Sequence, residues 1–348
     1  MNARWKNRPA GSNWGEFGPD DQRGRMNLVT REKVLQGIAE VKEGLTFCCS
    51  LPLDYPGGQV LNPRRAPPRL AATSREGKQF FCRPLVEYNE NMTDVICDDQ
   101  VLMALQYSTQ WDSFAHVGSR FDADGDGKAE LVFYNGFRAG EHIVPAAEKK
   151  SEAWDRFEGS EARALGIQGL AEHGAQGRGV LIDLHHHFGR KRQAVGYDDL
   201  MRVLEKDKVE VERGDMVCIY TGFADVLLEM KKKPDAKLLN ETCTGLDGRD
   251  AKLLQWICDS GLACLLADNY AVELIATSLT DALPRAQPWL PLHEHCLFKN
   301  GIHLGEMFYF TELARWLRAH QRNRFLFTAP PLRLPGAVGS PATPIATV

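Results

Sequence analysis

Short apolar runs alternate with helical patterns along most of the chain. The apolar runs predict strands at residues 101–117, 131–134, 179–184, 216–221 and 263–267. Stripes of apolar residues at three- and four-residue spacing predict helices at residues 30–44, 197–205, 249–259 and 310–317. In the first of these, Thr30 can cap the helix and Gly44 can end it. This alternation favours a mixed α/β architecture.

Three segments lie outside the alternation. Residues 14–21 place aromatic side chains among Gly, Pro and Asp, which indicates an ordered loop whose rings are buried. Residues 52–72 are rich in Pro and Arg and predict a long loop, a kind of segment that often borders a ligand site. Whether this loop contributes to a site stays open at this point. Residues 329–348, rich in Pro, Ala and Gly, predict an extended tail packed against a neighbouring subunit.

Composition narrows the class of partner. The chain has 348 residues, 43% of them hydrophobic, which is enough for one large domain or two ordinary ones. Its net charge of -4 offers no basic excess for nucleic acid or for an anionic membrane, so we expect a small-molecule partner. Without a signal-peptide pattern, and with nine cysteines that show no C-x-x-C spacing, we expect a cytoplasmic protein with reduced thiols.

A polar face on the run at 101–117 is the first candidate for chemistry. In an extended strand, four side chains would point to one side: Gln110, Asp112, Phe114 and His116. Burying an amide and a carboxylate without partners costs on the order of several kcal/mol unless hydrogen bonds or a metal ion compensate. Both interpretations, hydrogen-bonded strand residues and a metal site, remain open for this pattern alone.

A second candidate lies between residues 291 and 306, which hold three histidines and two glutamates. If the segment forms a helix, a turn and a strand, His293 and Glu306 converge from its two ends. The alternative is that both are surface residues, and their spacing does not decide between the two.

Two further patterns look like metal sites and are set aside. Residues 122–127 begin like a calcium loop, but the twelfth position is Phe133, where a bidentate Glu is required, so we expect an acidic turn. His185, His186 and His187 follow a predicted strand in direct succession. Consecutive side chains of a strand cannot all face one ion, so the three are left out of the metal set, and whether they reach the pocket stays open.

The segment 106–116 resembles the signature H-x-G-T-H-x-D-x-P-x-H of the cyclase family that includes kynurenine formamidase and isatin hydrolase. Three positions match that signature: Thr109, Asp112 and His116. Four positions depart from it: Gln106 and Gln110 in place of the first two histidines, Ser108 in place of the glycine, and Phe114 in place of the proline.

Other segments resemble the same family in the same order. They are the opening residues 14–30, the G-D-x-V-x-x-x-T-G strand at residues 214–222, and the late pair formed by His293 and Glu306. The Gln-Trp-Asp form at residues 110–112 resembles a longer-chain branch of the family.

The resemblance implies four metal ligands, namely Gln110, Asp112, His293 and Glu306, with His116 as the general acid/base. Substrate-binding residues are not identified. A donor set dominated by oxygen with at most one imidazole favours Mn²⁺ as the divalent metal ion, with Zn²⁺ as the other candidate.

The implied fold is the family's α/β swivelling β/β/α domain, with a mixed central sheet or barrel flanked by helices. We expect a single domain over residues 1–348 with an extended tail from about residue 329, assembled as a homo-oligomer, either dimer or tetramer. The implied reaction is hydrolysis of a carbonyl–nitrogen bond in an amide or cyclic amide. The alternatives are a metal-dependent cyclase, dehydratase or lactone hydrolase, and a metal-stabilised binding protein without turnover.

Overall fold

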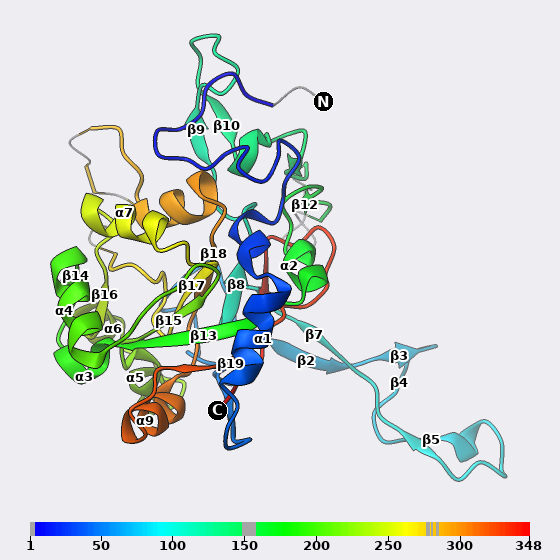
Figure 1. Ribbon diagram of the computed structural model, residues 1–348. Coiled ribbons are helices and arrows are strands. Elements are labelled where there is room, and N and C mark those ends of the chain that lie inside the picture. The colour runs from blue at the N-terminus through cyan, green and yellow to red at the C-terminus, as the bar shows by residue number, and fades with distance from the viewer. Residues whose placement is uncertain (1–3, 148–157, 276–278, 280, 283–284) are drawn as a thin grey trace.

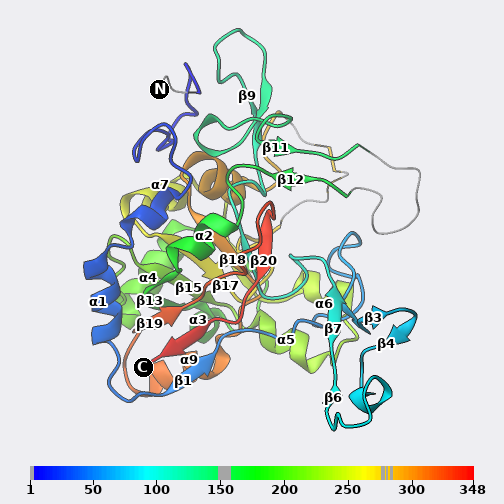
Figure 2. The same ribbon diagram turned by 90° about the vertical axis from the view of Figure 1, so that its right-hand side faces the viewer.

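A mixed sheet forms the centre of the computed structural model, which describes residues 4–147, 158–275, 279, 281–282 and 285–348. Within these residues the sheet has nine strands in the order β1-β21-β19-β13-β15-β17-β18-β8-β20. It curls, and helices pack against both of its faces (Figures 1 and 2). The bounds of its strands are β1 Thr46–Cys48, β8 Gln110–Asp112, β13 Gln176–Asp183, β15 Met216–Tyr220, β17 Cys264–Ala267, β18 His303–Glu306, β19 Arg324–Thr328, β20 Gly339–Pro341 and β21 Ile345–Thr347. The α/β architecture expected from the sequence is confirmed.

The helices follow the strands in the alternation that the sequence predicts. The bounds of the α-helices are α1 Arg31–Ala39, α2 Gln168–His173, α3 Leu184–Phe188, α4 Tyr197–Asp207, α5 Phe223–Glu229, α6 Ala236–Glu241, α7 Ala251–Asp259, α8 Pro291–His293 and α9 Thr311–Ala319. The 3-10 helices are η1 Gly24–Leu28, η2 Leu85–Glu87 and η3 Tyr134–Gly136, and η5 Glu294–Lys299 is a π-helix. Thr30 caps α1 by accepting a hydrogen bond from the Lys33 N–H at 3.3 Å. We had expected this helix to end near Gly44, but it ends at Ala39. No helix in the described ranges is long and apolar enough to cross a membrane.

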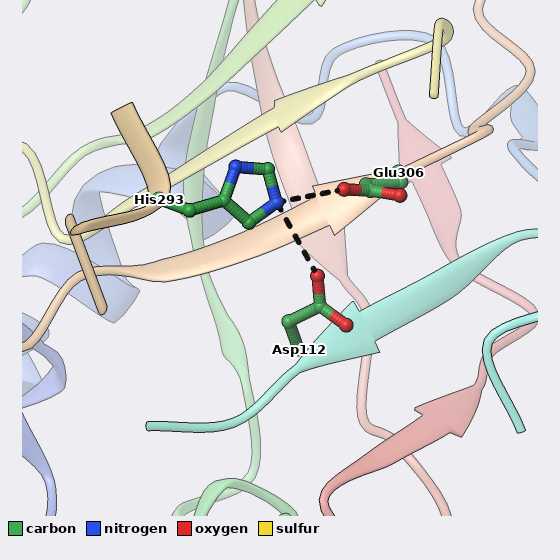
Figure 3. A group of neighbouring side chains, drawn as sticks. All are labelled: Asp112, His293 and Glu306. Atoms are coloured by element: carbon green, nitrogen blue, oxygen red, sulfur yellow. Dashed lines mark hydrogen bonds and ion pairs between the residues drawn. The ribbon is translucent and has the colours of Figure 1, made fainter. Parts of the chain in front are cut away.

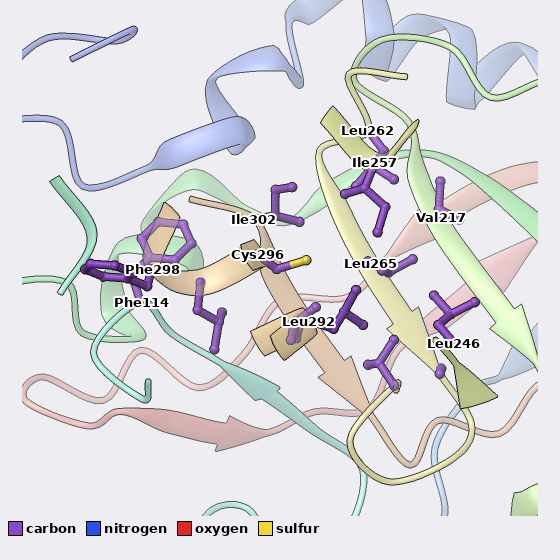
Figure 4. Close-up of a cluster of buried hydrophobic side chains, with 14 of the residues drawn as sticks. Phe114, Val217, Leu246, Ile257, Leu262, Leu265, Leu292, Cys296, Phe298 and Ile302 are labelled. Carbon is purple, nitrogen blue, oxygen red and sulfur yellow. The ribbon is translucent and has the colours of Figure 1, made fainter. Parts of the chain in front are cut away.

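The parallel strands β13, β15, β17 and β18 are buried because apolar layers cover both faces of the sheet. Alternate side chains of β15 enter opposite layers. Val217 and Ile219 join the cluster that contains Ile257 of α7 (Figure 4), whereas Met216 and Cys218 join the one that contains residues of α9. This two-sided burial explains why the strands have continuous apolar sequences.

Two buried carboxylates accept hydrogen bonds at the ends of the parallel strands. Asp215 accepts two hydrogen bonds from the Arg178 guanidinium at 2.9 Å each and one from Lys33 Nζ at 3.1 Å. Asp268 accepts hydrogen bonds from the Thr221 N–H and hydroxyl at 2.7 Å each. The family-like strand at residues 214–222 therefore carries structural contacts at both of its ends.

The run at 101–117 is not one strand. It divides into β7 (Asp99–Leu102) and β8, and β8 ends at Asp112, after which the His116 N–H donates to the Ser113 carbonyl at 3.0 Å in a turn. The expectation that Phe114 shares the polar strand face is therefore wrong. The Phe114 ring lies in the apolar core, stacked on His303 with the ring centroids 4.0 Å apart.

The C-terminal residues are part of the sheet. β20 pairs with β8, and β21 pairs with β1 and β19, so residues 329–348 are integrated into the fold where we had expected a tail. The N-terminal loop behaves as predicted, since Trp14 is fully buried and its indole N–H donates to the Phe298 carbonyl at 2.8 Å.

Small two-stranded sheets lie outside the central sheet. They pair β9 (Ser119–Phe121) with β10 (Glu130–Val132), β11 (Ile143–Val144) with β12 (Glu161–Ala162), and β14 (Gln193–Val195) with β16 (Thr244–Leu246). A projecting arm, residues 69–102, pairs β2 (Arg69–Ala72) with β7, β3 (Ser74–Arg75) with β4 (Lys78–Gln79), and β5 (Arg83–Pro84) with β6 (Val95–Ile96) (Figure 1).

Candidate metal centre

Strand β8 lies between β18 and β20, and this pairing assembles most of the candidate site. In the antiparallel register of β8 and β18, Gln110 lies directly opposite Glu306, and Asp112 lies opposite Leu304. Directly opposed residues of antiparallel strands have Cβ atoms about 4.5–5.5 Å apart, so their side chains meet on one face. Gln110 and Asp112 point to this face because they are two residues apart on β8.

His293 reaches the same face from a helical segment. α8 begins at Pro291 and continues through η5 to Lys299, and the chain then turns back into β18. The spacing of His293 and Glu306 therefore does correspond to a helix, a turn and a strand. His293 Nε2 lies 3.1 Å from Glu306 Oε1 and 4.0 Å from Asp112 Oδ2 (Figure 3).

Potential ligand atoms of Asp112, His293 and Glu306 all lie within 4.8 Å of one another, and all three residues are buried. Among the described residues, neither carboxylate oxygen of Asp112 has a hydrogen-bond partner, nor does Gln110 Oε1. Gln110 Nε2 instead donates to Glu306 Oε2 at 3.1 Å. Buried polar atoms are normally paired, so these unsatisfied oxygens beside an imidazole and a second carboxylate fit a divalent cation.

The electrostatics of the cluster agree with this fit. Burial, followed by the charge of Glu306, raises the pKa of Asp112 to about 8. Burial alone would lower the pKa of His293, but its hydrogen bonds to Glu273 and Glu306 outweigh that effect and raise it to about 10. Burial would likewise raise the pKa of Glu306, yet the hydrogen bond and charge of His293 lower it. Burial and the charge of Glu306 thus disfavour the ionised form of Asp112, and a cation beside it would favour that form.

His116 stands next to the cluster and remains accessible. Its Nε2 lies 3.8 Å from Asp112 Oδ1, and 22% of its side chain is exposed, whereas Asp112 is fully buried. Burial, followed by the positive charges of His293 and Arg65, lowers the pKa of His116 to about 3. The imidazole is therefore neutral near pH 7.

Sequence reasoning missed Glu273. This residue lies in the loop after β17, and one of its oxygens, Oε1, is 2.8 Å from His293 Nδ1 and accepts from the His293 N–H at 3.1 Å. The other oxygen accepts from the Leu292 N–H at 3.1 Å. A carboxylate on the far nitrogen of a histidine fixes the ring and directs its Nε2. A single Glu in an irregular segment gives no sequence signal for this role.

The long loop at residues 52–72 does border the site. Arg65 Nη1 donates to the Gln106 carbonyl at 2.7 Å. The positive charge of Arg65 favours the ionised forms of Asp112 and Glu306, although burial outweighs it and raises the pKa of Asp112. A cavity of about 30 Å³ lies here, lined by Arg65, Gln106 and Met307 among others. Gln106, which stands where the family has its first histidine, lines this cavity.

The two patterns set aside in the sequence have other contacts. His187 in α3 pairs through Nε2 with Asp207 at 2.8 Å, and His185 packs on Tyr220 with ring centroids 5.3 Å apart. In the acidic turn, the oxygens of Asp122, Asp124 and Asp126 come within 4.8 Å of one another. Asp122 Oδ1 accepts backbone N–H groups of the turn itself, from Gly125 at 2.7 Å and Asp126 at 3.1 Å.

A sequence model of the Cyclase family matches residues 50–274, well over half of the chain. The chain belongs to the Cyclase family. The matched range includes Gln110, Asp112, His116 and Glu273 of this cyclase-family protein, while His293 and Glu306 follow it. A search of curated proteins finds no match.

Solved structures confirm the fold of this cyclase-family member. A protein described as a novel cyclase is 29% identical, superposes with a TM-score of 0.71, and aligns over 97% of both chains. Isatin hydrolase A from Ralstonia solanacearum is 13% identical with a TM-score of 0.52, over 91% of this chain and 97% of that one. An isatin hydrolase bound to the product analogue thioisatinate is 12% identical with a TM-score of 0.53, over 92% and 99%. The expected family fold with its mixed central sheet is therefore established.

Proposed function

We propose that the protein is a metal-dependent hydrolase that cleaves a carbonyl–nitrogen bond in an amide or cyclic amide of a small organic molecule. The observation that carries this proposal is the fully buried, hydrogen-bond-deficient Asp112 carboxylate facing His293 and Glu306, with the partly exposed His116 3.8 Å from it. The fold shared with isatin hydrolases supports a cyclic amide as the first substrate class to test.

Gln110, Asp112, His293 and Glu306 would hold one divalent ion, and the three side chains that donate oxygen favour Mn²⁺ over Zn²⁺. When bound, such an ion supplies a water of lowered pKa and a polarised substrate carbonyl. Glu273 keeps the His293 ring oriented, and Gln110 Nε2 holds one oxygen of Glu306 in place.

His116 would act as the base and then as the acid. Its neutral Nε2 accepts a proton from the attacking water and returns it to the leaving nitrogen, which then departs as a neutral amine. A cavity of about 680 Å³ is lined by Val117, which follows His116 in sequence, and by Trp289 and Leu290 among others. These apolar side chains would suit an aromatic or otherwise apolar substrate.

A metal analysis of the purified protein followed by a turnover screen tests the proposal. We expect one equivalent of a divalent ion, and hydrolysis of at least one member of a panel of lactams, imides and linear amides in the presence of added Mn²⁺. If the metal-loaded protein turns over lactones or dehydrates its substrate while leaving every amide intact, the alternative reaction classes are correct. Metal binding without any turnover would instead indicate a metal-stabilised binding protein.

Replacing Gln110 by His should shift the metal preference towards Zn²⁺. An imidazole suits Zn²⁺ better than an amide oxygen does, and the variant restores a ligand type at the position where the family has histidine. Competition titrations with Mn²⁺ and Zn²⁺ measure the ratio of the two affinities, which we expect to change by about tenfold or more, or about 1.4 kcal/mol. Gln176→His, at an exposed glutamine that donates to the Thr328 hydroxyl, is the matched control. An equal response of the two variants would place Gln110 outside the ligand set.

Replacing Glu273 by Gln should weaken metal binding without removing a ligand. The variant retains an oxygen for the His293 Nδ1–H but lacks the charge that increases the basicity of the ring, so we expect affinity to fall by about 10- to 100-fold. Isothermal titration with Mn²⁺ gives the affinity, and circular dichroism verifies the fold. Glu294→Gln is the control, because Glu294 contacts Ser119 and Lys299 and not the ligand cluster. Unchanged affinity in the Glu273 variant would refute the orienting role.

A further inference from the structure

The arm at residues 69–102 has no core of its own. None of its residues is buried, and its strands pair only as separate two-stranded sheets. Isolated two-stranded ribbons are marginally stable in water. The outer part, in which β5 pairs with β6 through Arg83 and Ile96 and through Pro84 and Val95, therefore depends on few interactions for its order.

Two cysteines face each other at the base of this outer part. The register that sets Arg83 opposite Ile96 places Cys82 opposite Cys97, one position closer to the body. Their Sγ atoms are 3.8 Å apart, and the Cys82 N–H donates to Cys97 Sγ at 3.1 Å. Both cysteines are exposed, so a soluble thiol reagent can reach either sulfur.

The other cysteines do not share these features. Cys49, Cys218, Cys243, Cys264 and Cys296 are buried, and Cys258 is partly buried and faces His295 Nε2 at 3.3 Å. Cys48 is exposed, but its Sγ faces the Ser50 hydroxyl at 3.4 Å. Of the nine thiols, Cys82 and Cys97 thus combine exposure with a cysteine partner across a strand pair.

We propose that Cys82 and Cys97 are a site of reversible oxidation, forming an intramolecular disulfide that closes the outer part of the arm. A disulfide bond is about 2.05 Å long, so the sulfurs must approach by about 1.8 Å from their separation of 3.8 Å, a movement that rotation of two exposed side chains provides. The site uses no residue of the metal centre and is independent of the proposed catalysis.

The oxidant is a small disulfide of the glutathione class. One cysteine thiolate attacks a sulfur of oxidised glutathione, which forms a mixed disulfide and releases one glutathione thiolate. The second cysteine thiolate then attacks the protein sulfur of that mixed disulfide and displaces the second glutathione. One S–S bond forms for each one broken, two electrons pass to glutathione, and the two cysteine protons end on the released thiols.

The disulfide would restrict the opening of the arm and would leave the rest of the fold unchanged. It closes a loop over residues 83–96, which restricts the opened forms of the outer part that a protease must capture. We therefore expect cleavage within residues 83–96 to be at least about fivefold slower in the oxidised chain than in the reduced one.

Incubation of the full chain in mixtures of reduced and oxidised glutathione, with alkylation of free thiols and peptide mass spectrometry, tests the proposal. We expect a peptide cross-linked between Cys82 and Cys97 that is lighter by two hydrogen atoms than its reduced parts, and that returns to free thiols in excess reduced glutathione. Cys48→Ser, the matched control, should leave this cross-link intact. Cys97→Ser should leave Cys82 with only a glutathione adduct, and Cys82→Ser should give the reciprocal result.

Three outcomes would overturn the proposal: separate glutathione adducts on both cysteines of the unmodified chain, a cross-link that joins two chains, or full alkylation of both thiols after oxidation. Because Cys82 and Cys97 lie in an exposed arm and Cys48 is also exposed, circular dichroism should show the same fold for all three variants. An oxidised chain with the cross-link but an unchanged rate of cleavage within residues 83–96 would refute the predicted closure of the arm.

Discussion

Asp112→Asn should abolish metal binding and activity without lowering the stability of the metal-free protein. The amide lacks the charge of a ligand carboxylate. Loss of an orienting partner lowers metal affinity by about 10- to 100-fold, and we expect the loss of a ligand to lower the affinity for Mn²⁺ by more than that. Metal content of the purified variant and titration with Mn²⁺ measure this loss. Asp126→Asn, in the exposed acidic turn, is the matched control and should retain full metal content.

The stability part of this prediction follows from the sign of the pKa shift. The pKa of Asp112 is raised from 3.8 to about 8 by burial and by Glu306, so folding favours the protonated acid, and the metal-free protein loses stability as the pH rises through that window. The amide of the Asp112→Asn variant cannot ionise, so at pH 8 the melting temperature of the metal-free variant should equal or exceed that of the unmodified protein. Addition of Mn²⁺ should raise the melting temperature of the unmodified protein alone. A variant that keeps its metal would refute the ligand assignment.

His116→Ala should remove turnover and leave the metal in place. A positioned acid/base contributes about 10²–10⁴-fold, so kcat and kcat/KM should fall together by at least about a hundredfold. Metal content and melting temperature should change little, because His116 is partly exposed and lies 3.8 Å from Asp112 without a close hydrogen bond to it. Loss of metal together with activity would make His116 a ligand, and retained activity would exclude it from the mechanism.

The pH behaviour of His116 differs from that of an ordinary histidine. Burial, His293 and Arg65 lower the pKa of His116 from 6.5 to about 3, so the ring should stay neutral from pH 5 to 8. NMR of the imidazole resonances, assigned by their absence from the His116→Ala variant, measures this directly. A His116 signal that titrates between pH 6 and 7 would contradict the environment described here.

The four candidate ligands were assigned from the resemblance to the family, because periodicity and spacing alone left a surface or hydrogen-bonded role open for each of them. His293 and Glu306 flank one helix-turn-strand unit, and Gln110 and Asp112 share a face at period-two spacing. The end of β8 at Asp112 could not be found, since Phe114 and His116 continue the alternation that a strand would show. Only the tertiary placement of the Phe114 ring against His303 reveals the turn.

The C-terminal strand and Glu273 were missed for different reasons. β20 is a three-residue strand that contains Pro341, and its sequence has neither the length nor the β-branched content of a typical strand. Pro341 is tolerated because β20 is at the edge of the sheet, where no neighbouring strand needs the backbone N–H that proline lacks. Glu273 acts through His293, 20 residues later in the chain, and a contact of that kind depends wholly on how the loop after β17 folds.

The pairing of β8 with both β18 and β20 also sets the order in which the protein can mature on the ribosome. Residues 110–112 are synthesised long before their neighbours at residues 303–306 and 339–341. Strand pairs so distant in sequence form slowly, because a long loop must close before the pairing stabilises it. A nascent chain would therefore carry Asp112 on an unpaired strand until residues 303–341 have been synthesised. Ion capture, and with it any enzymatic competence, would have to wait until synthesis has passed residue 341.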